Sequence, residues 1–433
     1  MTRIHKAQHS EPRYQWRFAV TIGVAVNKPP PTMTPVMTSA NRAPHLALSP
    51  RQAWSAVGAM AMCVAMLIAS EFMPVSLLTP IAADLGATEG MAGQAISISG
   101  LFAVVTSLLI PTIASRFDRR HVLVALTAVM LASLVLIAAA PNFAVFMAAR
   151  ALLGITVGGF WALATATVMR LVPAESVPRA LGIMYMGNAI ATAFAAPVGS
   201  YLGDIIGWRG IFWGLAPIVV VNLAWQWVSL PPMAPRSANP VRKVLGLLRR
   251  RNVSIAMLAV MLSFAGAFAS FTYLRPFLET VARVTVPQLS LLLLGLGLAG
   301  FAGTWAATAL LGRHLYPLLR WLPLALAAVT LALLAVGHVL WAVALVLVAW
   351  GAINSAVPVS WSTWLSEGLR DQPESGGGLM VAAIQLSIML GAAFGGVLLD
   401  HVSVGAPLVG GAVLLVLAFL VAGDGARLRS KAL

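Results

Sequence analysis

The sequence predicts an all-α polytopic membrane protein with twelve transmembrane helices, arranged as two six-helix pseudo-repeats. Three observations predict this class. Apolar residues make up 60% of the 433 residues, and charged residues only 9%. The apolar residues gather in runs of about 20, the length that crosses a hydrocarbon core about 30 Å thick as a helix. Finally, Lys and Arg fall in alternate gaps between these runs.

The apolar runs also give the boundaries of the helices and domains. We predict spans at residues 54–79, 91–114, 121–140, 143–169, 180–203, 210–230, 253–278, 287–311, 320–337, 339–364, 378–400 and 404–423. The resulting domains are a disordered arm (1–50), an N-terminal bundle (51–230), a basic cytoplasmic linker (231–252), a C-terminal bundle (253–425) and a tail (426–433). The arm is rich in Pro, Arg, Ser and Thr, and its apolar run at 18–26 is too short to span and lacks a small-residue cleavage site.

The basic residues orient the chain. Of the 28 Lys and Arg, only Arg209, Arg275 and Arg283 fall on one side of the predicted topology, and Arg150 lies inside a span. The positive-inside rule therefore places both termini in the cytoplasm. The net charge of +15 consists of these dispersed topology signals, so we do not expect nucleic acid as a partner.

Two segments about 196 residues apart indicate an internal repeat. Residues 195–204 (AAPVGSYLGD) align with residues 391–400 (GAAFGGVLLD). The matching pairs are Ala196 with Ala392, Gly199 with Gly395, Leu202 with Leu398, and Asp204 with Asp400. Parallel repeats joined by a basic linker are typical of transporters whose substrate site lies near the midplane, between the halves.

Two charged residues lie within predicted spans, both in the N-terminal half. Glu71 lies beyond the middle of the first span and Arg150 about two turns into the fourth, whereas the repeat counterparts are Ala267 and Val346. An ionised carboxylate at this depth costs roughly 3 kcal/mol, so intramembrane acids are functional by default. We expect Glu71 to carry a coupled proton and Arg150 to sense Glu71 or a substrate. In the alternatives, Glu71 only fixes helix packing, and the Arg150 stem snorkels to the interface.

Aromatic and amide residues at depth provide candidates for substrate binding. Trp161 and Trp361 offer faces on which a flat heterocycle stacks. Asn188, Asn354 and Gln385 supply paired donors and acceptors, as the edge of a base requires. The alternative for each Trp is an anchor at the lipid interface. The alternative for each amide is a hydrogen bond between helices.

Small residues and proline in the fifth span suit a bend. Pro197 lacks a backbone donor, and Gly199 lets a neighbouring helix approach closely. We expect this segment to rock between two packings, with static close packing as the alternative.

Motifs of enzymes and cofactor sites are missing. The 7 His residues form no HExxH, and no GxSxG elbow or P-loop is present. Residues 295–300 (GLGLAG) match the dinucleotide fingerprint by letter but lie within an apolar helix, with no preceding strand. The single cysteine, Cys63, forms no internal disulfide. We therefore expect no enzyme activity, no metal and no cofactor, and transport driven by an ion gradient.

Several segments resemble the drug:proton antiporter-1 branch of the major facilitator superfamily over about residues 51–425. They are the loop containing Arg116, Asp118, Arg119 and Arg120, residues 150–159 (RALLGITVGG), 195–200 (AAPVGS), 71–80 (EFMPVSLLTP) and 206–209 (IGWR). The resemblance implies the major facilitator fold, a gating role for the loop, and proton coupling through Arg150. The loop departs from the family pattern at Pro111, where Gly is usual, and at Ser115, where Asp is usual.

Three further segments resemble the bacterial purine ribonucleoside efflux pumps: residues 158–173, 263–276 and 357–364. This resemblance implies proton-coupled export of inosine- and guanosine-type nucleosides across the inner membrane, by what we expect to be a monomer. One alternative is a sugar or multidrug exporter of the same superfamily. The other, from a different class, is a membrane sensor or assembly factor that transports nothing.

Overall fold

The computed structural model describes residues 49–235, 241–369 and 372–429, and helices dominate these ranges. The α-helices are α1 (Pro50–Ser76), α2 (Leu78–Leu85), α3 (Glu89–Ala114), α4 (Arg119–Ala138), α5 (Phe143–Leu171), α6 (Val177–Ser229), α7 (Val241–Gly246), α8 (Arg251–Phe271), α9 (Leu274–Thr280), α10 (Val286–Val336), α11 (Leu340–Gly368), α12 (Pro373–His401) and α13 (Ala406–Ala422). Short 3₁₀ turns lie at Ala174–Ser176, Leu247–Arg249 and Ala426–Leu428. No strand occurs within these ranges.

Nine helices in the described ranges are long and apolar enough to cross a membrane. Two of them, α6 with 53 residues and α10 with 51, are about twice the length that a bilayer requires. Each is broken once by a non-helical residue, Gly207 in α6 (φ 74°) and His314 in α10 (φ −129°), and therefore contains two spans. The shorter apolar helix α13 adds another. The prediction of twelve transmembrane helices is confirmed.

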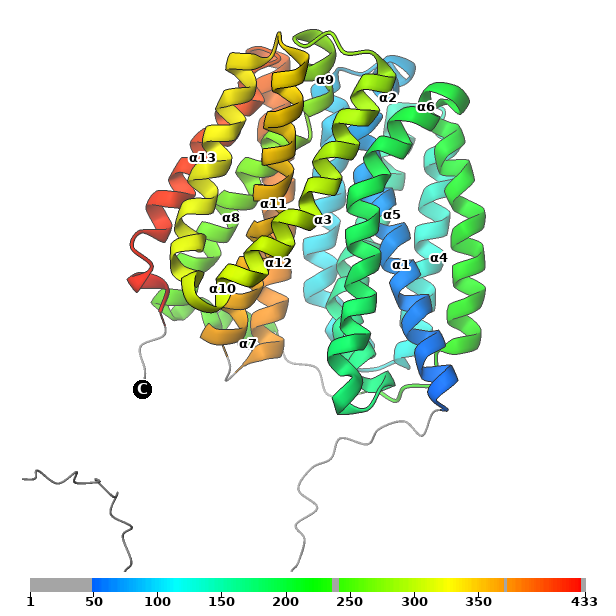
Figure 1. Cartoon of the computed structure of the whole chain (residues 1–433). Helices are drawn as coiled ribbons and strands as arrows, with labels where there is room; N and C mark the ends of the chain where they lie inside the picture. Colours follow the sequence, from blue (N-terminus) through cyan, green and yellow to red (C-terminus); the bar gives the residue numbers. More distant parts are fainter. Residues whose placement is uncertain (1–48, 236–240, 370–371, 430–433) are drawn as a thin grey trace, which may run out of the picture. The chain divides into compact units, whose positions relative to one another are not determined.

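The internal repeat is visible in the packing as well as in the sequence. Gly154 of α5 lies so close to the carbonyl of Ser99 in α3 that a Cβ would clash with it. Gly351 of α11 lies in the same way against the carbonyl of Leu296 in α10. The second pair follows the first at the offset of the sequence repeat, to within one residue. Figure 1 shows the two sets of helices, blue to green for the first half and light green to red for the second.

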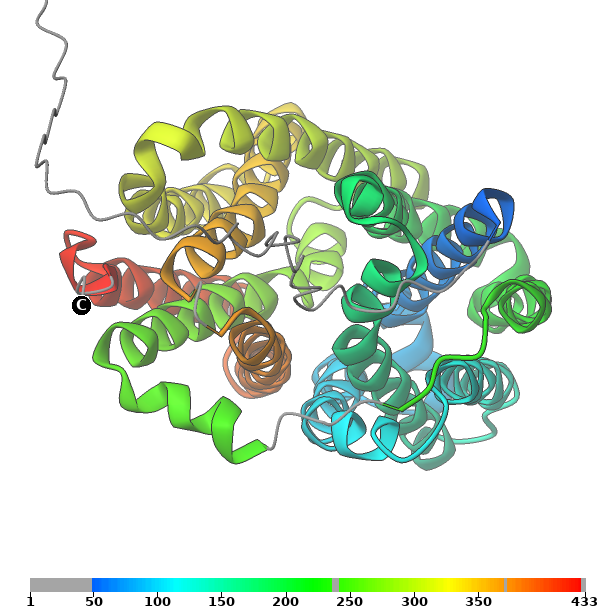
Figure 2. The same ribbon diagram turned by 90° about the horizontal axis from the view of Figure 1, so that it is seen from below.

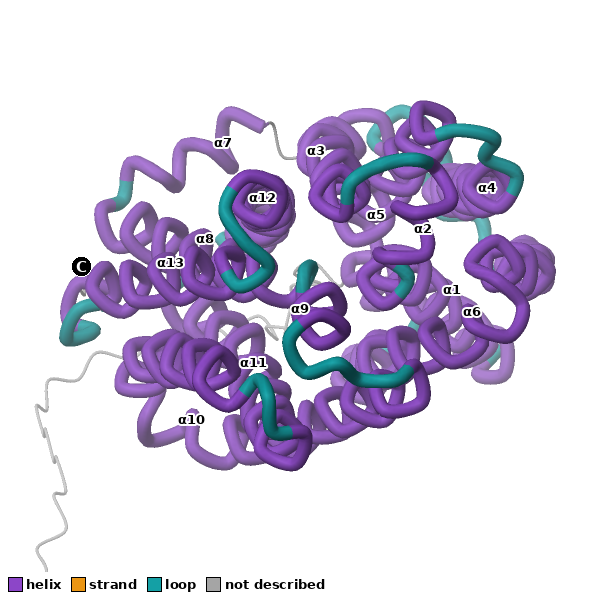
Figure 3. Tube along the Cα trace, turned by 90° about the horizontal axis from the view of Figure 1, so that it is seen from above, coloured by secondary structure: helices purple, strands orange, loops and turns teal. Residues whose placement is uncertain are grey.

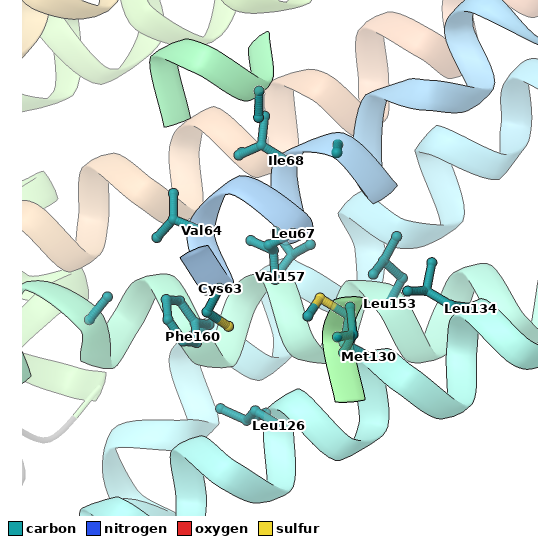
Figure 4. Packing of buried hydrophobic residues seen from close by; sticks show 14 of the residues in the cluster. Cys63, Val64, Leu67, Ile68, Leu126, Met130, Leu134, Leu153, Val157 and Phe160 are labelled. Carbon is teal, nitrogen blue, oxygen red and sulfur yellow. The ribbon is translucent and has the colours of Figure 1, made fainter. Parts of the chain in front are cut away.

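The N-terminal half has a continuous apolar core between α1, α4, α5 and α6. Leu67, Met130, Val157 and Phe160 are all completely buried in it, and Figure 4 shows them facing one another. The helices of this half are therefore held by close van der Waals packing, which is the main attraction between helices in a bilayer.

The described chain begins and ends at the same end of the molecule, which we call the terminal end; the other is the far end (Figure 1). Most of the predicted arm (1–50) lies outside the described residues, which begin at Ser49, the N-cap of α1. So do residues 236–240 of the linker and 430–433 of the tail. The domain boundaries stay a prediction. Figure 2 shows the terminal end, where α7 leads from the linker into α8.

Candidate functional site

A proline-induced break in α1 explains where Arg150 lies. Pro74 has no N–H, so it cannot donate to the carbonyl of Ser70 one turn earlier. The Arg150 guanidinium fills this position: Nη1 donates to the Ser70 carbonyl at 2.8 Å, and Nη2 donates to the Glu71 carbonyl at 3.1 Å. Arg150 is completely buried. Its side chain is thus fixed on the backbone of α1 and does not snorkel to an interface.

The same side chain ties a third helix to this point. Arg150 Nε donates to the Ala95 carbonyl of α3 at 3.1 Å, and the Ser99 hydroxyl donates back to the Arg150 carbonyl at 2.8 Å. Backbone carbonyls of α1 and α3 therefore hold all three guanidinium nitrogens. Within the described ranges, no ion pair links the guanidinium to the Glu71 carboxylate. Arg150 therefore contacts the backbone carbonyl of Glu71.

The Glu71 carboxylate faces the other half. Its Oε1 accepts a hydrogen bond from Nε2 of Gln385 in α12, with a distance of 3.5 Å. Both side chains are buried, at 3% and 6% exposure. The acid predicted to carry a proton and an amide predicted to bind substrate thus meet across the interface between the halves.

An aromatic contact lies beside this pair. Phe72 follows Glu71 in α1, and its ring lies 5.6 Å from that of Phe268 in α8. Phe268 also packs edge-on against Phe271, which stacks on Trp350 with ring centroids 5.8 Å apart. Sequence reasoning missed these residues, because a phenylalanine in an apolar span carries no sign of the face on which it lies.

Helices α3 and α12 lie side by side across the interface between the halves (Figure 3). The Ser97 hydroxyl donates to the Met389 carbonyl at 3.0 Å. At the far end, the carboxylate of Asp400 accepts from the Gly90 N–H at 3.0 Å and from the Thr88 hydroxyl at 2.6 Å. A residue of the second half thereby caps the first turn of α3, where free N–H groups and the helix dipole favour an anion.

A second contact at the far end joins the short helices α2 and α9. Arg275 is buried, donates to the Ser76 carbonyl across the interface, and forms an ion pair with Glu279 at 2.8 Å. The other oxygen of Glu279 accepts from the Thr79 hydroxyl at 2.7 Å. Figure 3 shows α9 beside α2. The sequence indicated only the side of the membrane on which Arg275 lies. Its bonds make it part of a latch, defined here as Ser76, Thr79, Arg275 and Glu279.

The predicted stacking residues differ in their surroundings. Trp161 is half-buried and stacks on Tyr185 of α6 with ring centroids 5.9 Å apart and an interplanar angle of 23°. Tyr185 is 46% exposed, and Asn188 lies one turn further along α6, half-buried. Sequence reasoning missed Tyr185. Its position three residues before Asn188 is the signal that places both near one face of a helix.

The candidate substrate-binding residues of the C-terminal half lie in different surroundings. Trp361 is only 1% exposed and packs edge-on against Trp364 in the core, with ring centroids 6.0 Å apart. In this conformation it faces the core of its own half. Asn354 is half-buried on α11. The structure thus brings Glu71 together with Gln385, and places Trp161 and Asn188 on neighbouring helices of the first half.

The predicted gating loop contains Arg116, Asp118, Arg119 and Arg120. Asp118 caps α4 by accepting from the Arg120 N–H at 2.8 Å, and it also accepts from the Met233 N–H at 2.8 Å. The Arg119 N–H donates to the Met233 carbonyl, and the Arg120 guanidinium lies over the Trp227 ring. Arg116 is exposed. These contacts hold the loop against the end of α6 in the same half, and gating stays a prediction.

Pro197 and Gly199 lie where α6 crosses α1. Pro197 is buried, and a Cβ on Gly199 would come within 2.8 Å of the Ser76 hydroxyl and 2.9 Å of the Met73 side chain. The close packing of α6 on the broken part of α1 therefore requires a glycine. Bending of this segment during transport stays a prediction. No group of three or more His, Cys, Asp or Glu gathers for a metal within the described ranges.

Comparisons with known proteins agree with this architecture. The sequence model of the Major Facilitator Superfamily matches residues 59–377. A Pseudomonas aeruginosa protein named transcription regulatory protein OpdE is 49% identical, covering 85% of this chain and 92% of its own. Purine ribonucleoside efflux pump NepI of Salmonella paratyphi B is 41% identical, covering 86% and 94%.

Among solved structures, a bacterial homolog of the human lysosomal transporter Spinster, inward-facing and occupied, matches with a TM-score of 0.71. The match covers 89% of this chain and 100% of that one at 14% identity, so it shows a shared fold. The chain therefore belongs to the Major Facilitator Superfamily and is a multi-pass membrane transporter, not an enzyme.

Proposed function

We propose that this transporter exports purine ribonucleosides, such as inosine and guanosine, across the bacterial inner membrane in exchange for protons. The observation that carries the proposal is the contact between the Glu71 carboxylate of the first half and the Gln385 amide of the second. The relatives named purine ribonucleoside efflux pumps, 41% identical over most of both chains, support the substrate class.

The Glu71–Gln385 contact suggests how a proton and a nucleoside exchange. An ionised Glu71 accepts from the Gln385 amide and partly offsets the cost of a buried charge. Protonation of Glu71 weakens this bond, because the carboxyl loses its charge. Each state of Glu71 therefore leaves Gln385 differently available to a nucleoside. Such coupling between two ligands is reciprocal, so nucleoside binding at Gln385 also changes the proton affinity of Glu71.

The first half offers a surface for the base. The stacked rings of Trp161 and Tyr185 provide an aromatic face, and Asn188 supplies a donor and an acceptor nearby. Asn354 and Gln385 supply amides from the second half. A nucleoside is neutral, so it needs no countercharge at depth. We leave Trp361 out of this set, because its ring is enclosed by the core of its own half.

The bonds at the far end suggest the other step of the cycle. The latch and the Asp400 cap join the halves there, so they must break before a substrate leaves at that end. We infer that the structure is closed at the far end. With the termini in the cytoplasm, the far end faces the periplasm, and the cycle alternates access between the two sides.

Topology gives the first test. We expect a C-terminal green fluorescent protein fusion to fluoresce and a C-terminal alkaline phosphatase fusion to be inactive, because both reporters would lie in the cytoplasm. A phosphatase fused at Ser403, in the far-end loop between α12 and α13, is the matched control and should be active. The opposite pattern would reverse the direction of the proposed cycle.

Substrate gives the second test. We expect everted membrane vesicles to accumulate labelled inosine when a proton gradient is imposed, and the strain to resist toxic purine nucleosides. Gln385→Ala should reduce inosine transport about fivefold, since a lost hydrogen bond costs about 1 kcal/mol. Gln94→Ala, which removes the amide that donates to the Ala393 carbonyl across the interface, is the control. It should retain more inosine transport than Gln385→Ala at low inosine concentration. Robust sugar or drug export with no nucleoside transport would establish the alternative exporter.

The relative named a transcription regulatory protein supports a second candidate, a membrane sensor that alters gene expression. A transport-defective Glu71→Gln variant separates the two. If the protein acts as an exporter, the phenotype of this variant matches that of a gene deletion. If it acts as a sensor alone, the variant expresses the dependent genes at the wild-type level, and neither the variant nor the wild type transports nucleosides.

A further inference from the structure

Four polar side chains meet in the apolar core of the N-terminal half, away from Glu71. Cys63 comes from α1, Thr127 from α4, and Asn222 and Gln226 from α6. All four are completely buried. The Thr127 hydroxyl lies 3.1 Å from Oε1 of Gln226 and 3.5 Å from the Cys63 thiol, which also interacts with both amides. Figure 4 shows Cys63 beside Phe160, within the surrounding apolar cluster.

The amide groups of this cluster lack sufficient partners. Neither Nδ2 nor Oδ1 of Asn222, nor Nε2 of Gln226, makes a hydrogen bond of ordinary geometry with the described residues. The Thr127 hydroxyl has a single proton, which it shares between Gln226 and the Leu123 carbonyl. A thiol is only a weak partner for an amide. Buried polar atoms are almost always satisfied by protein or by ordered water, and lipid offers no substitute.

The second half shows that the fold does not require polar residues here. The repeat counterparts of Cys63, Thr127, Asn222 and Gln226 are Ala259, Pro323, Ala418 and Ala422. All four counterparts are buried and apolar. The corresponding positions are therefore small and apolar in one half and carry amides, a hydroxyl and a thiol in the other.

We propose that the junction formed by Cys63, Thr127, Asn222 and Gln226 is a binding site for ordered water. Water suits this site because it donates and accepts, and because a buried water usually makes about three hydrogen bonds. The donors Asn222 Nδ2 and Gln226 Nε2 and the acceptor Asn222 Oδ1 provide such a set. Bound water would cross-link α1, α4 and α6 within the half that contains Glu71 and Arg150, while the four corresponding positions of the other half offer water no polar side chain. The proposal does not depend on the substrate.

Cys63 is a native reporter for this site. Intense X-ray pulses split water into hydroxyl radicals where the water lies, and these radicals oxidise an adjacent sulfur. We would irradiate the purified protein in detergent and measure the oxidation of Cys63 and Met130 by mass spectrometry. Both are completely buried sulfur side chains of the same core. After correction for their intrinsic reactivities, bound water predicts oxidation of Cys63 about tenfold faster than that of Met130.

Variants show whether the amides hold the water. Asn222→Leu combined with Gln226→Leu should lower the Cys63 rate about tenfold, to that of Met130, because the polar partners are gone. Ser263→Ala, at a buried serine of the other half, is the control and should leave the rate unchanged. Equal rates for Cys63 and Met130 in the wild type would overturn the proposal, even if the double variant failed to fold. An unchanged Cys63 rate in a folded double variant would overturn it as well.

Discussion

Glu71→Gln is expected to abolish proton-driven export while leaving nucleoside exchange in place. The substitution keeps the shape of the side chain and its contact with Gln385, but removes the group that takes up and releases a proton. We expect active inosine transport in proteoliposomes under an imposed proton gradient to fall at least about a hundredfold, since no other acid would take its place. Exchange of labelled for unlabelled inosine, without a gradient, should continue, because it needs no change of protonation.

Glu367→Gln is the matched control, because it makes the same chemical change at an exposed carboxylate near the terminal end of α11. It should transport as the wild type does. Gradient-driven inosine transport by Glu71→Gln at the wild-type rate would rule out Glu71 as the proton carrier. Loss of both transport and exchange would assign Glu71 the packing role that was the alternative.

Arg275→Gln is expected to shift the transporter toward a state open at the far end. The substitution leaves Glu279 without its ion-pair partner and removes the bond to the Ser76 carbonyl. The ion pair lies within α9 and exists in both states, whereas the bond to the Ser76 carbonyl crosses the interface. Loss of a hydrogen bond from a charged donor costs roughly 1.5–3 kcal/mol, which shifts a two-state equilibrium at least about tenfold. Only the state in which the latch is formed pays this cost, so the state in which it is broken gains population.

Spin labels on cysteines introduced at Pro141 and Ser403, exposed residues of far-end loops in the two halves, would measure this shift as a longer distance distribution. The single native cysteine is buried, so labels attach to the introduced positions. Arg283→Gln removes an exposed charge beside α9 and should leave the distances unchanged. If the distribution of Arg275→Gln matched that of the wild type, the latch would not hold the far end closed.

The course of the chain through the membrane could be read from the sequence, because the bilayer fixes the length of an apolar run that spans it. The two unusually long helices α6 and α10 do not contradict this reading. The break at Gly207 lies in the predicted gap between spans 5 and 6, and the break at His314 in the gap between spans 8 and 9. The repeat was readable because pairs such as Asp204 and Asp400 end corresponding spans.

The partners of the site residues were not readable to the same extent. In water, an apolar stripe reveals the buried face of a helix, but a helix in lipid is apolar on every side. The sequence therefore did not distinguish Trp361, which faces the core of its own half, from Trp161, which stacks on Tyr185. Nor did it show that Pro74 frees a carbonyl for Arg150, since the two residues meet only after α1 and α5 have packed.

The position of Arg150 also bears on how the protein is made. An arginine within the hydrocarbon core costs up to roughly 3 kcal/mol on insertion scales, so α5, which carries Arg150 about two turns from its start, would enter the bilayer poorly by itself. Every acceptor of the guanidinium, on Ser70, Glu71 and Ala95, lies on a helix that the ribosome completes before α5. Because α1 is synthesised before α5, its free carbonyls can already lie in the membrane when Arg150 enters and can accept hydrogen bonds from the guanidinium.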